Sequence, residues 1–197
     1  ADSGKLIASF DHQEGLYGAE FSPDGARILT AGIDKTAKLW DADSGKLIAS
    51  FAHQEGVTHV NFSPDGARTL TASTDKTAKL WDVASGELIT SFAHQDGVRW
   101  AAFSPDGARI LTASTDKTAK LWDPTSGKLI ASFAHQDGVS AGAFNPDGAR
   151  ILTGSADNTA KLWDVASVNL IASFAHQGTV RAVAFSPDGA RILTGSA

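Results

Sequence analysis

The feature that most constrains this chain is an internal repeat with a fixed period. The tripeptide Leu-Trp-Asp begins every 41 residues, at Leu39, Leu80, Leu121 and Leu162. The same interval separates five copies of Phe-Ser/Asn-Pro-Asp-Gly, which begin at Phe21, Phe62, Phe103, Phe144 and Phe185. A unit of this length cannot bury its apolar faces alone, so the repeats are predicted to stack against one another.

Each repeat predicts four short β-strands. Within residues 46–82, the runs KLIASF, VTHVNF, ARTLTAS and TAKLWD are apolar or alternating, and turn-forming segments separate them. Pro fixes φ and Gly accepts positive φ, so Pro-Asp-Gly and Ser-Gly favour turns. Runs of about six residues are too short for typical helices. The prediction is an all-β chain, and four strands per repeat of this length are typical of a propeller blade.

The motif DKTAKLWD, the FSPDG turn and a His 28 residues before the Trp resemble the WD-repeat (WD40-type) β-propeller family. The resemblance covers essentially the whole chain, although the family's Gly-His pair is Ala-His or Asp-His here. It implies a single array over 1–197, built from four-stranded antiparallel blades, four of them complete. The expected blades are about 16–51, 57–92, 98–133 and 139–174, with a partial blade at 180–197 and a lone strand at 5–10.

The resemblance also implies one buried hydrogen-bond network per blade. It combines a His before the first strand, a Thr in the second, an Asp in the next turn and a Trp in the third. A neutral imidazole both donates and accepts, whereas indole only donates and carboxylate only accepts, so the four groups can satisfy one another. The four sets are His12, Thr30, Asp34 and Trp40; His53, Thr71, Asp75 and Trp81; His94, Thr112, Asp116 and Trp122; and His135, Thr153, Asp157 and Trp163.

The same residue types could form a catalytic triad or a His-based metal site. A triad needs a single constellation with an oxyanion site and a substrate cleft, whereas His, Thr and Asp recur here in every blade. The repeated His residues lie on different blades and could share one metal only if all faced the central axis. We therefore expect no catalytic residue, no metal site and no cofactor, and a protein that is not an enzyme.

Composition argues against several classes of partner. The formal net charge is −5, whereas nucleic acid and anionic lipid attract a basic footprint. No apolar run approaches the roughly 18 to 20 residues that span a bilayer. The chain has no Cys, which excludes disulfides and thiolate metal sites. We expect no nucleic acid and no membrane as partners; the sequence does not fix the location, and the cytoplasm is favoured.

The repeats differ most at the start of the first strand. The two adjacent variable columns are Tyr17, Thr58, Arg99, Ser140 and Arg181, then Gly18, His59, Trp100, Ala141 and Ala182. Aromatic and Arg side chains provide most interface hot spots. The hypothesis is that a protein partner binds Tyr17, His59, Arg99, Trp100 and Arg181, and neutral drift at exposed strand starts is an equal alternative. Two constant columns, of Arg (Arg27 and its repeats) and of Lys (Lys38 and its repeats), are expected at solvated sheet edges.

These features favour a non-catalytic protein-interaction or self-assembly scaffold. The alternative is a lectin-like propeller with one small-ligand site per blade, which would need an identical exposed set in every repeat. A hydrolase would need clustered carboxylates in the channel, for which Glu20 and Asn61 offer little support.

The fifth blade lacks its third strand, so ring closure needs a longer parent chain, a different tail or a second copy. An unpaired sheet edge templates pairing with another chain. Rings commonly have four to eight blades, so two copies with four complete blades each could share one ring. We therefore favour a homodimer.

Overall fold

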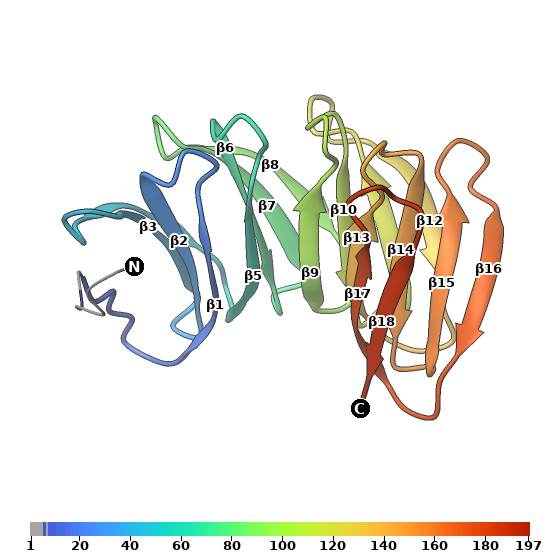
Figure 1. The fold of residues 1–197 in the computed structure, drawn as a ribbon. Coiled ribbons are helices and arrows are strands. Elements are labelled where there is room, and N and C mark those ends of the chain that lie inside the picture. Colours follow the sequence, from blue (N-terminus) through green and yellow to red (C-terminus); the bar gives the residue numbers. More distant parts are fainter. Residues whose placement is uncertain (1–5, 7) are drawn as a thin grey trace.

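The computed structural model describes residues 6 and 8–197, and it confirms the all-β prediction. Every regular element in that part of the chain is a β-strand, and the strands form four four-stranded antiparallel sheets and one two-stranded sheet (Figure 1). No helix in the described part of the chain could span a membrane.

The strands follow one another in sequence within each sheet. The first sheet holds β1 (Leu16–Phe21), β2 (Arg27–Gly32), β3 (Thr36–Asp41) and β4 (Leu47–Ala52). The second holds β5 (Val57–Phe62), β6 (Arg68–Ser73), β7 (Thr77–Asp82) and β8 (Leu88–Ala93). The third holds β9 (Val98–Phe103), β10 (Ile110–Ser114), β11 (Thr118–Trp122) and β12 (Leu129–Ala134). The fourth holds β13 (Val139–Phe144), β14 (Arg150–Ser155), β15 (Thr159–Asp164) and β16 (Leu170–Ala175), and the fifth holds β17 (Val180–Phe185) and β18 (Ile192–Ser196).

Turn chemistry sets the strand boundaries. In the turn between β1 and β2, Gly25 has φ 72° and its N–H donates to the Ser22 carbonyl at 2.8 Å. Between the third and fourth strands the corresponding residues are Gly45, Gly86 and Gly127, all at positive φ. In the fourth sheet that left-handed position is occupied by Val168, at φ 59°.

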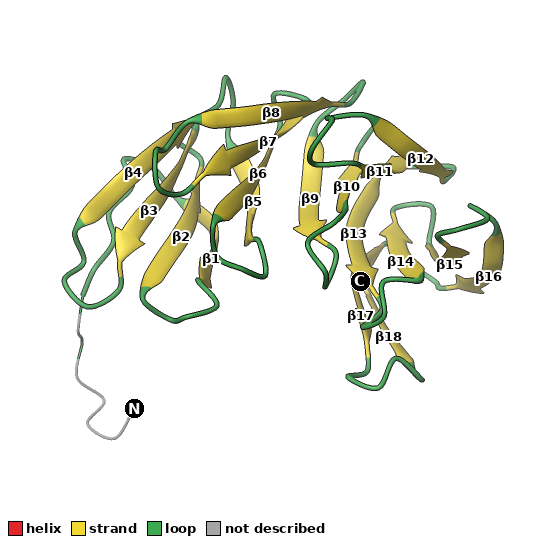
Figure 2. Ribbon diagram, turned by 90° about the horizontal axis from the view of Figure 1, so that it is seen from above, coloured by secondary structure: helices red, strands yellow, loops and turns green. Residues whose placement is uncertain are grey.

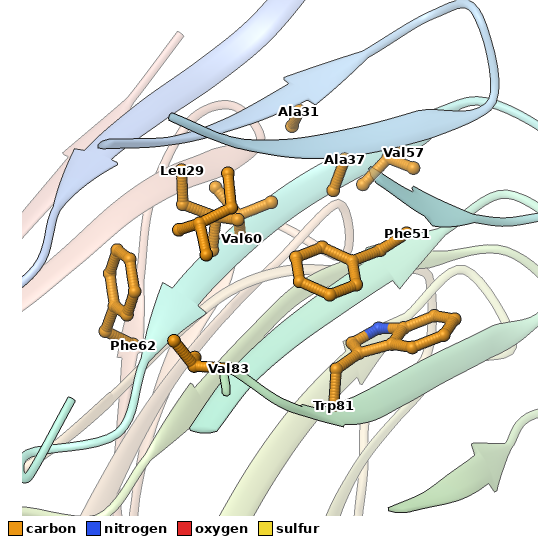
Figure 3. Packing of buried hydrophobic residues seen from close by; sticks show 10 residues of the cluster. Leu29, Ala31, Ala37, Phe51, Val57, Val60, Phe62, Trp81 and Val83 are labelled. Atoms are coloured by element: carbon orange, nitrogen blue, oxygen red, sulfur yellow. The ribbon is translucent and has the colours of Figure 1, made fainter. Parts of the chain in front are cut away.

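Neighbouring sheets pack face to face through apolar side chains. Between the first two sheets, Leu29 and Phe51 of the first lie in one buried cluster with Val60, Phe62 and Trp81 of the second (Figure 3). The Phe51 and Trp81 rings are 5.2 Å apart. Similar clusters join the second sheet to the third and the third to the fourth, so the core is a series of layers between sheets.

The sheets are arranged as an open arc. The first strands β1, β5, β9, β13 and β17 line its inner side, and the fourth strands lie on its outer side (Figure 2). The two end sheets are well separated, which leaves apolar side chains exposed on both. Leu193 is 72% exposed, whereas its repeat counterpart Leu29 is fully buried, and Phe21 is 62% exposed, whereas Phe62 is 5% exposed.

The expected lone strand at 5–10 is not seen. Lys5 and Ile7 lie outside the described residues, and residues 6 and 8–10 belong to no strand. Phe10 still lies 5.6 Å from the Trp40 ring, where it takes the place that Phe51 takes against Trp81. In a complete sheet the outermost strand forms its backbone hydrogen bonds with a third strand of the same sheet. No described strand lies in that position beside residues 8–10, so these residues pack without pairing as a strand.

Candidate interaction site

The structure brings the four polar side chains of each complete repeat together. In the second repeat, Trp81 Nε1 donates to Thr71 Oγ1 at 2.9 Å, and His53 Nε2 lies 2.7 Å from the same hydroxyl. His53 Nδ1 lies 2.8 Å from Asp75 Oδ2. Because the carboxylate only accepts, Nδ1 carries the proton, and the Thr71 hydroxyl donates to Nε2. The donors thus run in one direction, from Trp through Thr and His to Asp.

The same geometry recurs in the other complete repeats. The imidazole Nδ1 to carboxylate distances are 3.0, 2.8 and 2.9 Å for His12–Asp34, His94–Asp116 and His135–Asp157. These imidazoles are fully buried, with both ring nitrogens occupied by protein partners, so none is open to a substrate or metal. Within residues 6 and 8–197, no three His, Asp or Glu side chains are grouped to hold a metal ion.

The Asp residues of these networks are held ionised. Burial alone would raise the pKa of Asp116, but hydrogen bonds from Thr118, the Gln95 backbone N–H and His94 together lower it to about 2. For Asp75 the same balance of burial against hydrogen bonds leaves the pKa well below its ordinary value. The network therefore connects the loop before the first strand of a sheet, which holds the His, to the turn between its second and third strands, which holds the Asp.

The constant Lys and Arg columns are not free at solvated edges as expected. Lys79 Nζ donates to the Ala52 carbonyl at 2.9 Å and lies 5.6 Å from the centre of the Trp81 ring. Arg150 donates to the Gly189 carbonyl of the next sheet at 3.1 Å. The aliphatic stems of such side chains can cover apolar surface while the charged ends find carbonyl oxygens. Hydrogen bonds between adjacent sheets thus come from Lys79, Lys120 and Lys161 and from Arg27 and Arg150.

Two adjoining hollows lie on the inner side of the arc, and the variable column lines them. One, of about 430 Å³, is bordered by Tyr17, Thr58, Arg99, Ser140 and Arg181, one residue from each repeat. Thr115, Asp137, Gly138, Val139 and Ala156 complete its lining. The column therefore converges on a single place in the fold.

Not every member of that column is free to bind. Thr58 Oγ1 donates to the Val98 carbonyl at 2.7 Å, and Ser140 Oγ donates to the Val180 carbonyl at 2.7 Å. These hydroxyls join the first strands of neighbouring sheets. The exposed side chains of the column are those of Tyr17, Arg99 and Arg181, which are three of the five residues predicted to bind a partner.

The other two predicted residues, His59 and Trp100, form the wall of the second hollow. It measures about 350 Å³, and Tyr17 and Thr58 border both hollows. The His59 and Trp100 rings are 5.6 Å apart, and His59 Nδ1 is buried without a hydrogen-bond partner. Burial lowers the pKa of His59 to about 4, opposed by the Ala101 carbonyl, so the ring is neutral at pH 7. Trp100 packs over Gly142 of the next sheet, where a Cβ would stand 2.7 Å from Cζ3 of the indole.

Glu20 and Asn61 connect the inner strands. Asn61 Nδ2 donates to Glu20 Oε1 at 3.1 Å, and the Phe103 N–H donates to Asn61 Oδ1 at 3.0 Å. Burial raises the pKa of Glu20, while Asn61 and the Phe62 N–H oppose the shift. These hydrogen bonds connect β1, β5 and β9, so the Glu20 carboxylate, which borders the second hollow, has a structural role.

Comparison with known families identifies the architecture. The sequence profile described as "WD domain, G-beta repeat" matches residues 4–41, 45–82, 86–123, 127–164 and 168–197. The chain belongs to the WD40 repeat family. No curated protein matches the chain.

The WD40 repeats are out of phase with the sheets. The match at 45–82 contains β4 of the first sheet and β5, β6 and β7 of the second. The matches at 45–82, 86–123 and 127–164 therefore each contribute the outer strand of one blade and the three inner strands of the next, which couples neighbouring blades covalently. The match at 168–197 contains β16, β17 and β18.

WD40 domains generally mediate protein–protein interactions and are generally non-catalytic scaffolds. At that level, the family match supports an interaction function for this chain.

Proposed function

We propose that this chain is a non-catalytic interaction scaffold that self-associates through the faces of its two end sheets, so that two copies share one ring. The observation that carries the proposal is the contrast between each end face and its buried internal counterparts. Phe21 on β1 and Leu193 on β18 are largely exposed, whereas Phe62 and Leu29 are buried between the first two sheets.

The internal interfaces indicate how the end faces would fit together. Leu29 on β2 and Phe62 on β5 belong to the same buried cluster, so a Leu on one sheet already packs against the face that holds a Phe on the next. Leu193 and Phe21 are the corresponding residues on the two end faces. Packing the β18 face of one copy against the β1 face of another would remove both from water, at roughly 25 cal/mol per Å² of apolar surface buried.

The test is the solution mass measured by light scattering after size exclusion. A mass twice the 20.5 kDa monomer is expected, and Phe21→Lys or Leu193→Lys should shift the protein toward the monomer. Ile130→Lys is the matched control, because Ile130 is an exposed apolar residue on β12, far from both end faces. A monomer at every concentration, or equal loss of the dimer in all three variants, would show that the end faces do not associate.

We further propose that the inner hollows bind a protein partner through Tyr17, Arg99 and Arg181, with His59 and Trp100 forming the wall. The support is that the side chains that differ among otherwise similar repeats converge there. Aromatic and Arg side chains are the residue types that most often dominate binding energy.

Photo-crosslinking tests this partner surface. A photoreactive phenylalanine analogue at Tyr17 or Arg99 should capture one common protein in cells, and the same group at Ile130 should not. Identical capture from all three positions, or none from the first two, would count against the hollows. Their lining differs between repeats, which favours one protein partner over a lectin-like site in every blade; a glycan array with strong binding would reverse that preference.

A further inference from the structure

We propose that the second hollow binds the guanidinium group of an arginine side chain on the protein partner, beside Tyr17 and Trp100 and against the Glu20 carboxylate. The inference rests on the proposed partner surface and names the chemistry that this part of it recognises. All residues that border the hollow lie on β1, β5 and β9, the first strands of three consecutive complete sheets (Figure 2). Its volume of about 350 Å³ suits a single inserted side chain.

The charge of the second hollow favours a cation. Glu20 borders it, and the rest of its described lining carries no charge at pH 7. His59 is neutral there because burial lowers its pKa to about 4. The first hollow differs, because Arg99 and Arg181 border it. The uncharged residues of the second hollow are Tyr17, Gly18, Ala19, Thr58, His59, Val60, Asn61, Trp100 and Ala102.

The Glu20 carboxylate is half-buried and receives its hydrogen bonds from neutral groups. Asn61 Nδ2 lies 3.1 Å from Oε1, and the Phe62 N–H donates to Oε2 at 3.3 Å. Burial without a counter-charge is unfavourable for a carboxylate, and burial raises the pKa of Glu20 accordingly. A carboxylate offers about four acceptor positions, so two donors leave part of that capacity free. A guanidinium in the hollow supplies both the missing charge and the missing donors.

The aromatic residues of the hollow favour guanidinium over ammonium. Tyr17 and Trp100 border it, and a cation is attracted to the face of such rings. Guanidinium is planar and more weakly hydrated than ammonium, so it stacks on aromatic rings and loses less hydration on entering a hollow. The indole is also held in place, because it packs closely over Gly142 of the next sheet. The site is therefore largely formed before a ligand arrives.

Glu20 and Trp100 each occur once in the array, unlike the hydrogen-bond networks of the complete repeats. Three of the other four repeats have Ala at the position of Glu20, so a sheet does not need a carboxylate there. The positions equivalent to Glu20 are Asn61, Ala102, Ala143 and Ala184, and those equivalent to Trp100 are Gly18, His59, Ala141 and Ala182. The combination of one carboxylate and one indole is therefore specific to this hollow.

The experiment is a titration of the full chain, labelled with ¹⁵N-tryptophan, with Nα-acetyl-arginine methylamide. The five Trp residues give five indole N–H signals, and Trp100→Phe identifies the signal of Trp100. The other four indoles donate to Thr hydroxyls within the networks and serve as internal references. A saturable shift of the Trp100 signal is expected, with the four reference signals unchanged.

Glu20→Gln should weaken binding of the probe about tenfold, because it removes the charge and keeps the shape of the side chain. Tyr17→Ala should weaken binding severalfold, and the fold tolerates it because Tyr17 is 56% exposed. Glu55→Gln is the matched control, since it removes the same charge from an exposed loop residue outside the hollow, and binding should not change.

The matching citrulline derivative tests the charge without any change in the protein. It has nearly the shape of the arginine probe but is neutral, so it should not shift the Trp100 signal. Equal shifts from both probes, no shift from either, or unchanged affinity in Glu20→Gln would overturn the proposal. Tighter binding of the lysine derivative than of the arginine probe would overturn the assignment to guanidinium.

The outcome is separable from that of the proposed partner surface. Capture of a common protein at Tyr17 and Arg99 without probe binding would leave the partner surface standing and overturn the arginine site. Specific binding of the arginine probe without any captured protein would support the arginine site and count against the partner surface.

Discussion

Val168 departs from the glycine that occupies the same turn in the first three sheets. The turn before the fourth strand has Gly45, Gly86 and Gly127 at positive φ in the first three sheets, but Val168 at φ 59° in the fourth. A left-handed conformation brings the Cβ of an L-residue too close to its own carbonyl oxygen, which costs about 1–2 kcal/mol. Glycine avoids that cost because it has no Cβ.

Val168→Gly is therefore expected to stabilise the protein. The gain of about 1–2 kcal/mol from relieved strain is reduced by about 0.5–1 kcal/mol, because Gly has more conformational freedom in the unfolded chain. Val168 is 38% exposed, so its truncation loses little buried surface. The net expectation is about 1 kcal/mol, or an increase in melting temperature of roughly 2–4 °C for a chain of this size.

The reciprocal change isolates the backbone term. A Cβ at Gly86 would have its nearest neighbour, the Ala49 Cβ, at 3.9 Å, which is ordinary contact. Gly86→Val should therefore destabilise by about 1 kcal/mol, because the strain of about 1–2 kcal/mol is partly offset by about 0.5–1 kcal/mol from the lower conformational freedom of Val in the unfolded chain. Urea denaturation at fixed protein concentration measures both variants. If Val168→Gly does not raise the midpoint while Gly86→Val leaves it unchanged, the strain argument is refuted.

Three further changes test the networks and the inner wall. Asp75→Ala should lower the unfolding free energy by about 1–3 kcal/mol, because the groups that donate hydrogen bonds to the Asp75 carboxylate would lose their acceptor. An unchanged melting temperature would contradict this prediction. Gly142→Ala should cost about 1–3 kcal/mol by overpacking against Trp100, and less when Trp100→Leu is also present; equal costs in both backgrounds would count against that contact. The pKa of His59 falls from 6.5 to about 4 on folding, so as pH falls below 6.5 the unfolded state binds the proton first and stability is lost down to about pH 4. His59→Phe should flatten urea midpoints between pH 7.5 and 4.5, and an equally steep loss would exclude His59 as the cause.

Much of the fold follows from the sequence because the repeat is strict and locally self-consistent. Alternating apolar runs and Pro-Asp-Gly turns predict the strands, and the structure has four-stranded antiparallel sheets where these runs occur. The network residues could also be chosen in advance, since their hydrogen-bonding capacities are complementary and their spacing is constant. Each of these features depends on contacts within a repeat or between adjacent repeats.

The functional surface was less accessible to sequence reasoning. A variable column predicts that Tyr17, Arg99 and Arg181 matter, but not that His59 turns inward with a buried nitrogen. A Lys at an alternate position of the third strand is predicted to point into solvent. In the structure, however, Lys79 lies over the Trp81 ring and donates to a backbone carbonyl. These outcomes depend on which side chain faces which across two sheets, and that is not encoded in the spacing of any one strand.

The sequence by itself determined the strands of the four complete sheets, their order and the residues of each hydrogen-bond network, because these depend on periodicity, turn chemistry and complementary hydrogen-bonding groups. Only the tertiary structure decided that the sheets form an open arc and that the variable residues converge on its inner side. The physical reason is that these properties arise from the stacking of whole sheets. Each interface between sheets adds a small rotation, and the curvature of the arc is the sum of these rotations over all interfaces.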